Sequence, residues 1–168
     1  MNKQPESFEE KNQEYFDEKK YRTIIVGKDG FKGNDEIQDA INALGDDEIM
    51  AEEREELLKH LKASNPLPLI LEAITKAKSH EIKSRLLSVC WEIDLNCSDH
   101  ILFFAELACS DDFNVALEAL TVIDNIEFIS DNTVLKNAEK IVNEKIKMKP
   151  VTSELLMDLK KIISAKMK

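Results

Sequence analysis

A self-match at a spacing of 31 residues constrains the fold of this chain more than any other feature of its sequence. Sliding the segment 65–95 onto 96–126 gives six identities, which fall at apolar stripe positions and at expected helix starts: Asn65 with Asn96, Ile70 with Ile101, Leu71 with Leu102, Ala77 with Ala108, Ser79 with Ser110, and Leu86 with Leu117. Six further pairs match as apolar, among them Ile82 with Phe113 and Leu95 with Ile126. A period of this size indicates stacked helical hairpins, in which each unit buries its apolar face only against its neighbours.

Apolar residues also recur at helical spacing on both sides of this repeat. Asn65 is predicted to cap the first helix of the repeat, with Pro66 as its first residue. The hairpins at the two ends match the repeat less well, as terminal units that face water on one side should. The sequence therefore predicts an all-α fold, an α-solenoid of about four antiparallel hairpins with eight helices. The predicted helices outside the repeat span 34–44, 47–63, 131–148 and 152–166.

The chain divides in composition at Asn34. Residues 1–33 form a polar segment that ends in a loop holding three of the four glycines. Phe8, Tyr15 and Phe16 give this segment one narrow apolar stripe, which predicts a marginal helix. The loop fits neither the G-x-G-x-x-G nor the Walker pattern, so we expect a structural or partner-contacting loop rather than a nucleotide site. Residues 34–168 are predicted to be the helical repeat domain.

The second helix of each repeat carries a recognisable start. Glu81-Ile82-Lys83 places an acid, an apolar residue and a base in succession, and Asp112-Phe113-Asn114 follows the same order without the base. This start resembles that of HEAT-type repeats. The resemblance implies a HEAT-like scaffold whose second helices line a shallow concave face. It implies no active site, because folds of this type serve many functions.

Residues that could support catalysis or bind a metal do not form a familiar pattern. Cys90, Cys97, His100 and Cys109 lack the close pairs of a structural zinc site, and Cys90 lies on an apolar stripe. No Gly-x-Ser-x-Gly sequence is present. We therefore expect no enzyme, no cofactor and no metal. The alternative is a small enzyme or a DNA base-excision module on the same scaffold, which would need converging buried titratable groups on the second helices.

Charge is unevenly distributed along the chain, whose net charge is −10. Nine lysines and four acids lie between positions 136 and 168, so the preceding residues carry −15. This balance disfavours nucleic acid and favours a basic protein partner. The acidic cluster concentrates the negative charge around a single base, Arg54, and consists of Asp46, Asp47, Glu48, Glu52, Glu53, Glu55 and Glu56.

The helix dipole favours acids in a first helical turn. Asp46, Asp47 and Glu48 lie at the start of the predicted helix 47–63, so the dipole explains these three acids. Glu52, Glu53 and Glu56 then lie deeper in that helix and repel one another. We select these three as candidate partner-binding residues, because a basic partner accounts for them where local stability does not.

Leu87 and Trp91 form a second candidate surface, together with Glu118. Leu87 and Trp91 lie one turn apart, away from the main apolar stripe of their helix. Either they contact a partner or they pack against the neighbouring hairpin. We favour packing for Trp91, because it aligns with Val122 in the repeat.

The expected function is a non-catalytic protein–protein interaction module: an adaptor, inhibitor or assembly factor for a basic partner. No apolar stretch follows Met1, and the longest apolar run, Ile101–Ala105, is too short to span a membrane. The three cysteines show no C-x-x-C spacing, which favours a reducing compartment. We therefore expect a cytoplasmic protein that contacts no membrane, and we leave its oligomeric state open.

Overall fold

The structure is a computed structural model that describes residues 30–167. The marginal helix expected in the polar segment, and the loop up to position 29, lie outside the described residues.

The described residues form eight α-helices, one short 3-10 helix and no strand, so the all-α prediction is confirmed. None of these helices is both long and apolar enough to cross a bilayer. The helices are α2 (Asn34–Leu44), α3 (Ala51–Lys62), α4 (Leu67–Lys76), α5 (His80–Glu92), η1 (Ser98–His100), α6 (Ile101–Ala108), α7 (Phe113–Asn125), α8 (Asn132–Lys147) and α9 (Ser153–Lys166).

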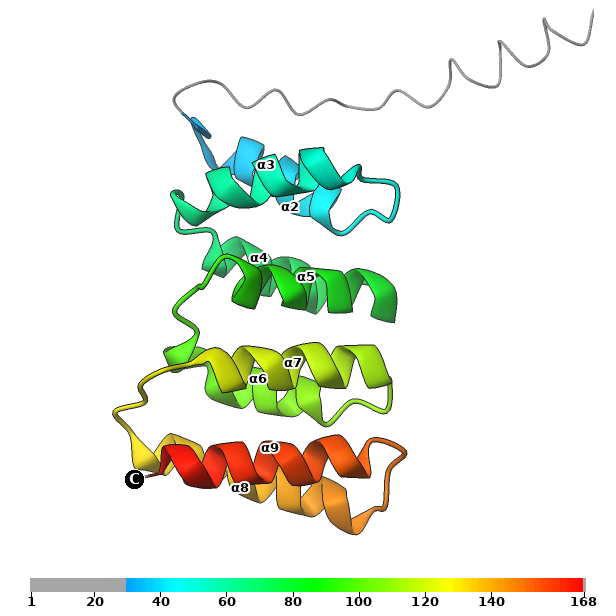
Figure 1. Ribbon diagram of the computed structural model, residues 1–168, viewed down its shortest axis with the longest axis vertical. Coiled ribbons are helices and arrows are strands. Elements are labelled where there is room, and N and C mark those ends of the chain that lie inside the picture. The colour runs from blue at the N-terminus through cyan, green and yellow to red at the C-terminus, as the bar shows by residue number, and fades with distance from the viewer. Residues whose placement is uncertain (1–29, 168) are drawn as a thin grey trace, which may run out of the picture.

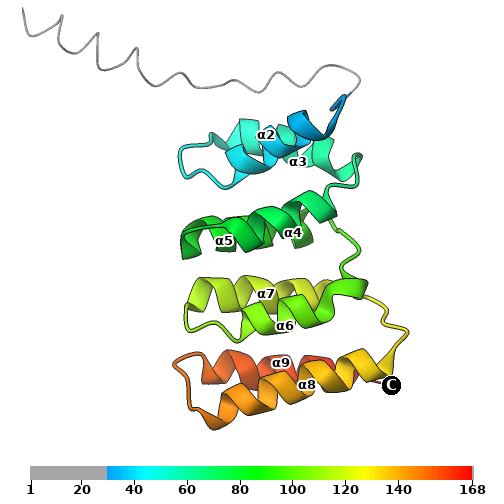
Figure 2. The same cartoon turned by 180° about the vertical axis from the view of Figure 1, so that it is seen from behind.

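The helices lie in antiparallel pairs, one above another along the long axis of the molecule (Figure 1). Each pair joins a first helix (α2, α4, α6 or α8) to a second helix (α3, α5, α7 or α9). The second helices lie on one side of the stack, and the first helices lie on the other, as the reverse view shows (Figure 2). The loops within pairs lie along one edge, at the right of Figure 1, and the connections between pairs lie along the opposite edge.

Apolar stripes hold the pairs together and also join each pair to the next. The predicted stripe of α2 is buried, from Ile37 to Leu44. In the middle of the stack, α7 contacts its partner α6 and also α5 and α9, while α6 contacts α8. A helix with neighbours on several sides buries more of its surface than one stripe. Each pair is therefore stabilised largely by the pairs beside it.

Both second helices of the repeat begin at polar caps. Ser79 Oγ accepts a hydrogen bond from the Ile82 backbone N–H at 3.2 Å, at the start of α5. Asp112 Oδ1 accepts one from the Val115 N–H at 3.0 Å, at the start of α7. Each bond satisfies a backbone donor that the first turn of a helix leaves without an intrahelical acceptor.

Replacing Asp112 with alanine is expected to lower the free energy of unfolding by about 1–2 kcal/mol, because the cap of α7 is lost. The substitution also removes the contact between Asp112 Oδ2 and His80 Nδ1, which are 3.3 Å apart. Chemical denaturation measures the loss. Asn114→Ala, an exposed change in the first turn of the same helix, is the control and should stay within about 0.5 kcal/mol of the wild type. Equal effects of the two changes would contradict the capping role.

The prediction that Asn65 caps the next helix is wrong. Asn65 adopts a left-handed backbone conformation with φ of 47°, and no side-chain cap is present at the start of α4. Asparagine tolerates this conformation better than most residues and often follows the end of a helix in it. Asn65 therefore turns the chain after α3, and α4 begins two residues later at Leu67.

One matched pair of the repeat is not part of the core. Ile82 is 37% exposed and Phe113 is 57% exposed. Both lie in the first turn of a second helix. The repeat therefore retains apolar character at a surface position as well as in the buried stripes.

Candidate functional site

The acidic cluster lies partly in a loop and partly in α3. The prediction that this helix starts at Asp47 is wrong, because α3 begins at Ala51. Glu52 and Glu53 are consequently its first-turn acids, and the helix dipole favours them. Glu52 and Glu56 are exposed, and Glu53 is half-buried. Local helix stability thus accounts for Glu52 and Glu53 but not for Glu56.

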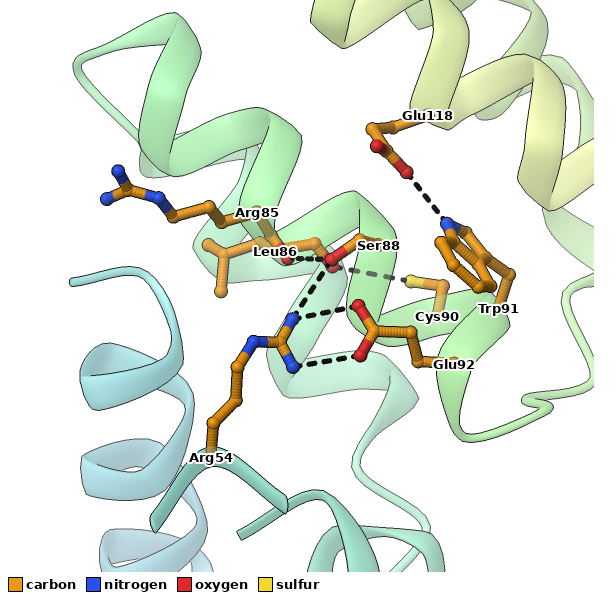
Figure 3. A network of polar contacts seen from close by, with 8 residues as sticks. All are labelled: Arg54, Arg85, Leu86, Ser88, Cys90, Trp91, Glu92 and Glu118. Carbon is orange, nitrogen blue, oxygen red and sulfur yellow. Dashed lines mark hydrogen bonds and ion pairs between the residues drawn. The ribbon is translucent and has the colours of Figure 1, made fainter. Parts of the chain in front are cut away.

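Arg54, the one base within the acidic cluster, is directed toward α5 (Figure 3). Its two guanidinium nitrogens each donate to a carboxylate oxygen of Glu92 at 2.8 Å. Nη2 also donates to Ser88 Oγ at 3.2 Å. This fork-shaped pairing fixes the direction of the guanidinium as well as its position. The positive charge of Arg54 is therefore matched by an acid of the next pair of helices.

The coupling between Arg54 and Glu92 is expected to be about 0.5–1 kcal/mol at low salt, because both side chains are still 25% exposed. A double-mutant cycle with Arg54→Met and Glu92→Gln measures it by chemical denaturation. The coupling should decrease as salt is raised. Single changes that add with no coupling energy would show that the pair does not link α3 to α5.

Trp91 joins α5 to α7. Its side chain is half-buried against the core, and its indole Nε1 donates to Glu118 Oε2 at 2.7 Å (Figure 3). A buried indole N–H generally requires an acceptor, and Glu118 supplies it from the next second helix. The structure thus brings together two of the candidate residues and places Trp91 at a contact between pairs.

Leu87 is fully buried, with 0% of its side chain exposed. It therefore cannot serve as a surface contact, although Trp91 lies one turn further along the same face. The cause is the close packing of α5 against α7, α4 and α2. An inner helix of the stack buries residues outside its main stripe, and Leu87 is one of them.

The network that joins the second helices was not predicted from the sequence. Arg54 and Glu92 are 38 positions apart, and Trp91 and Glu118 are 27 apart. A charge pattern within one helix does not indicate a partner on another. The repeat spacing provides a single hint, because Glu118 is near the position one repeat after Trp91.

The cysteines do not gather into a metal site within the described residues, where no group of three or more potential ligands lies close enough to hold an ion. Cys90 and Cys97 are buried free thiols that interact with each other. The hydrogen bond between them raises the pKa of Cys90, with burial adding to the rise, and the same bond lowers the pKa of Cys97. Burial raises the pKa of Cys109.

Comparison with protein-family models, curated proteins and solved structures finds no match to this chain.

Proposed function

We propose that this chain is a non-catalytic protein-interaction module, acting as an adaptor, inhibitor or assembly factor for a basic partner protein. Its scaffold is a HEAT-like α-solenoid, and its binding surface is the face formed by the second helices. The partner's positive groups contact Glu52, Glu53 and Glu56 on α3. Trp91 and Glu118 join α5 to α7 and so hold this face together in the middle of the stack.

The observation that carries the proposal is the direction of Arg54. A base within a run of acids ordinarily neutralises its neighbours. Here both terminal nitrogens of the Arg54 guanidinium donate hydrogen bonds to the Glu92 carboxylate of α5. The acids of α3 are left without that compensation. The helix dipole favours Glu52 and Glu53 but not Glu56, and all three acids attract a basic protein over a distance of about one Debye length.

The proposed location is the cytoplasm. Cys90, Cys97 and Cys109 are all free thiols. Buried unpaired cysteines are typical of proteins in reducing compartments, where disulfides do not persist. Fractionation of the native host, followed by detection with an antibody, tests the location.

Reversing Glu52, Glu53 and Glu56 to lysine is expected to lower the rate of association with the partner by about tenfold or more at low salt. The full chain is first used to isolate the partner from its native host, and mass spectrometry identifies it. Surface plasmon resonance then gives association and dissociation rates at low and physiological salt. The dissociation rate should change less than the association rate. An affinity indifferent both to salt and to these three changes would leave the acidic cluster as a solvated surface.

A further inference from the structure

Polar contacts link the second pair to the third and the third pair to the fourth, along the edge where the loops within pairs lie. His80 Nδ1 lies 3.3 Å from Asp112 Oδ2, which links the second pair to the third. Lys145 Nζ lies 2.9 Å from Asp111 Oδ1, which links the third pair to the fourth. Thr152 Oγ1 also donates to the Ser110 carbonyl at 3.2 Å across the second of these junctions. Polar and charged side chains thus hold these loop edges together.

The junction between the first and second pairs has one such bond at this edge, from Arg85 to the Gly45 carbonyl, and a cleft of about 540 Å³ lies beside it. Apolar side chains line it from α2, α4 and α5, and Ile82 is the most exposed of them. Gly45 at the end of α2 is also part of the lining. A Cβ at Gly45 would lie 3.1 Å from Ile82 Cγ2, so a larger residue there would press on the apolar wall.

Charged side chains of both signs line this cleft: the acids come from both pairs of helices, and the bases come from the second pair. The acids are Asp46, Asp47 and Glu81, and the bases are Lys76, Lys78 and Arg85. Asp46 and Asp47 are exposed on the side of the first pair, and Lys78 is exposed on the side of the second. Within residues 30–167, none of these three forms an ion pair.

Arg85 has unused hydrogen-bonding capacity in the cleft. Its Nη1 donates to the Gly45 carbonyl at 3.2 Å, and its side chain extends away from the Arg54–Glu92 pair (Figure 3). A guanidinium has five N–H donors, and the described residues supply Arg85 with no carboxylate. A ligand carboxylate is the chemical group that fits these remaining donors best.

We infer that this cleft binds a segment of the partner protein in a fixed orientation. An apolar side chain of the segment packs on Ile82, a basic residue on one side of it meets Asp46 and Asp47, and an acidic residue on the other side meets Arg85 and Lys78. The inference rests on the proposed function, because Asp46 and Asp47 begin the same acidic cluster that continues to Glu56. The partner thus presents a basic surface and an apolar residue, with an acidic residue on the side of that apolar residue away from the basic one.

Selection of a random dodecapeptide library on the full chain tests this inference. The enriched peptides should share an apolar residue with Lys or Arg on one side and Asp or Glu on the other. Synthetic copies labelled with a fluorophore then give Kd by fluorescence anisotropy. Ile82→Asp and Arg85→Gln should each raise Kd tenfold or more. Phe113→Asp, at the position equivalent to Ile82 in the next repeat, is the matched control and should change Kd by less than twofold.

Each other result overturns the inference. It fails if no peptide is enriched over a selection on an unrelated protein, or if the enriched peptides bind the Ile82→Asp chain unchanged, with circular dichroism showing that chain to be folded. It also fails if sedimentation shows a dimer that Ile82→Asp dissociates, because a second copy then occupies the cleft. The triple change Glu52→Lys, Glu53→Lys and Glu56→Lys separates the two proposals. If it abolishes peptide binding while the cleft variants do not, the cleft is excluded and the proposed function stands.

Discussion

Replacing Phe104 with alanine is expected to lower the free energy of unfolding by about 3–5 kcal/mol, the largest effect that we predict for any single substitution. Phe104 is 0% exposed and is among the largest fully buried side chains of the chain. It belongs to the buried core, and its helix, α6, contacts α7 of the same pair and α8 of the next. The substitution would leave a cavity in this core. Because the core is closely packed, the surrounding side chains can fill only part of that cavity.

Phe103 provides a matched control for this measurement. It is half-buried and adjacent in the chain, with its ring 5.4 Å from that of Phe104 at 82°. Phe103→Ala should cost clearly less, about 1–2 kcal/mol, because part of the removed surface is already in contact with water. Chemical denaturation of both variants decides the matter. Equal losses at the two positions would contradict the full burial of Phe104.

Replacing Trp91 with alanine is expected to cost about 2–4 kcal/mol of folding free energy, somewhat less than a fully buried aromatic residue. The change removes apolar contacts with the core and leaves Glu118 without its indole donor. Trp91→Phe keeps most of the apolar surface but lacks the N–H. It should therefore recover most of the loss and isolate the contribution of the hydrogen bond, about 1 kcal/mol.

Thermal and chemical unfolding of these two variants test whether Trp91 is structural. A melting temperature of Trp91→Ala unchanged from the wild type would reverse the assignment. Trp91 would then be a surface anchor for a partner, and its loss should remove about 2 kcal/mol or more of binding free energy, by the general behaviour of such anchors.

Local signals in the sequence were sufficient for most of the helices. Period-3.6 stripes located α2 from Asn34 to Leu44, and Gly45 marks its end. The expected helix starts at Ser79 and at position 131 coincide with the polar caps of α5 and α8. These features depend on residues within one turn of each other, so they can be read without knowledge of the packing.

The start of α3 could not be read in the same way. Asp46, Asp47 and Glu48 have the composition of a first helical turn, and the helix dipole would favour them there. In the structure the chain instead uses residues 45–50 to cross from α2 to α3, and the helix begins at Ala51. The length of that crossing is set by how the two helices pack, which no local pattern encodes.

The polar network of the second helices depends on packing even more strongly. The sequence places Arg54 among seven acids and indicates no partner for it on another helix. Its partner is Glu92, which was not among the candidate residues, because the two become adjacent only when the first pair lies on the second. Leu87 failed as a surface candidate for the same reason, since its burial comes from neighbouring helices rather than from its own.

Binding of a basic partner to the face of the second helices can be tested with two variants of equal net charge. One carries lysine at Glu52, Glu53 and Glu56 on α3. The other carries lysine at Glu72, Glu106 and Glu144, which are exposed on α4, α6 and α8, the first helices on the opposite side of the stack. Both raise the net charge equally, so a difference between them reports where the partner binds rather than how strongly the whole chain attracts it.

The deciding measurement is the association rate constant of each variant with the purified partner at low salt. We predict a reduction of about tenfold or more for the α3 variant and a much smaller one for the first-helix variant. Equal reductions in the two variants, or a larger one in the first-helix variant, would contradict binding at the face of the second helices.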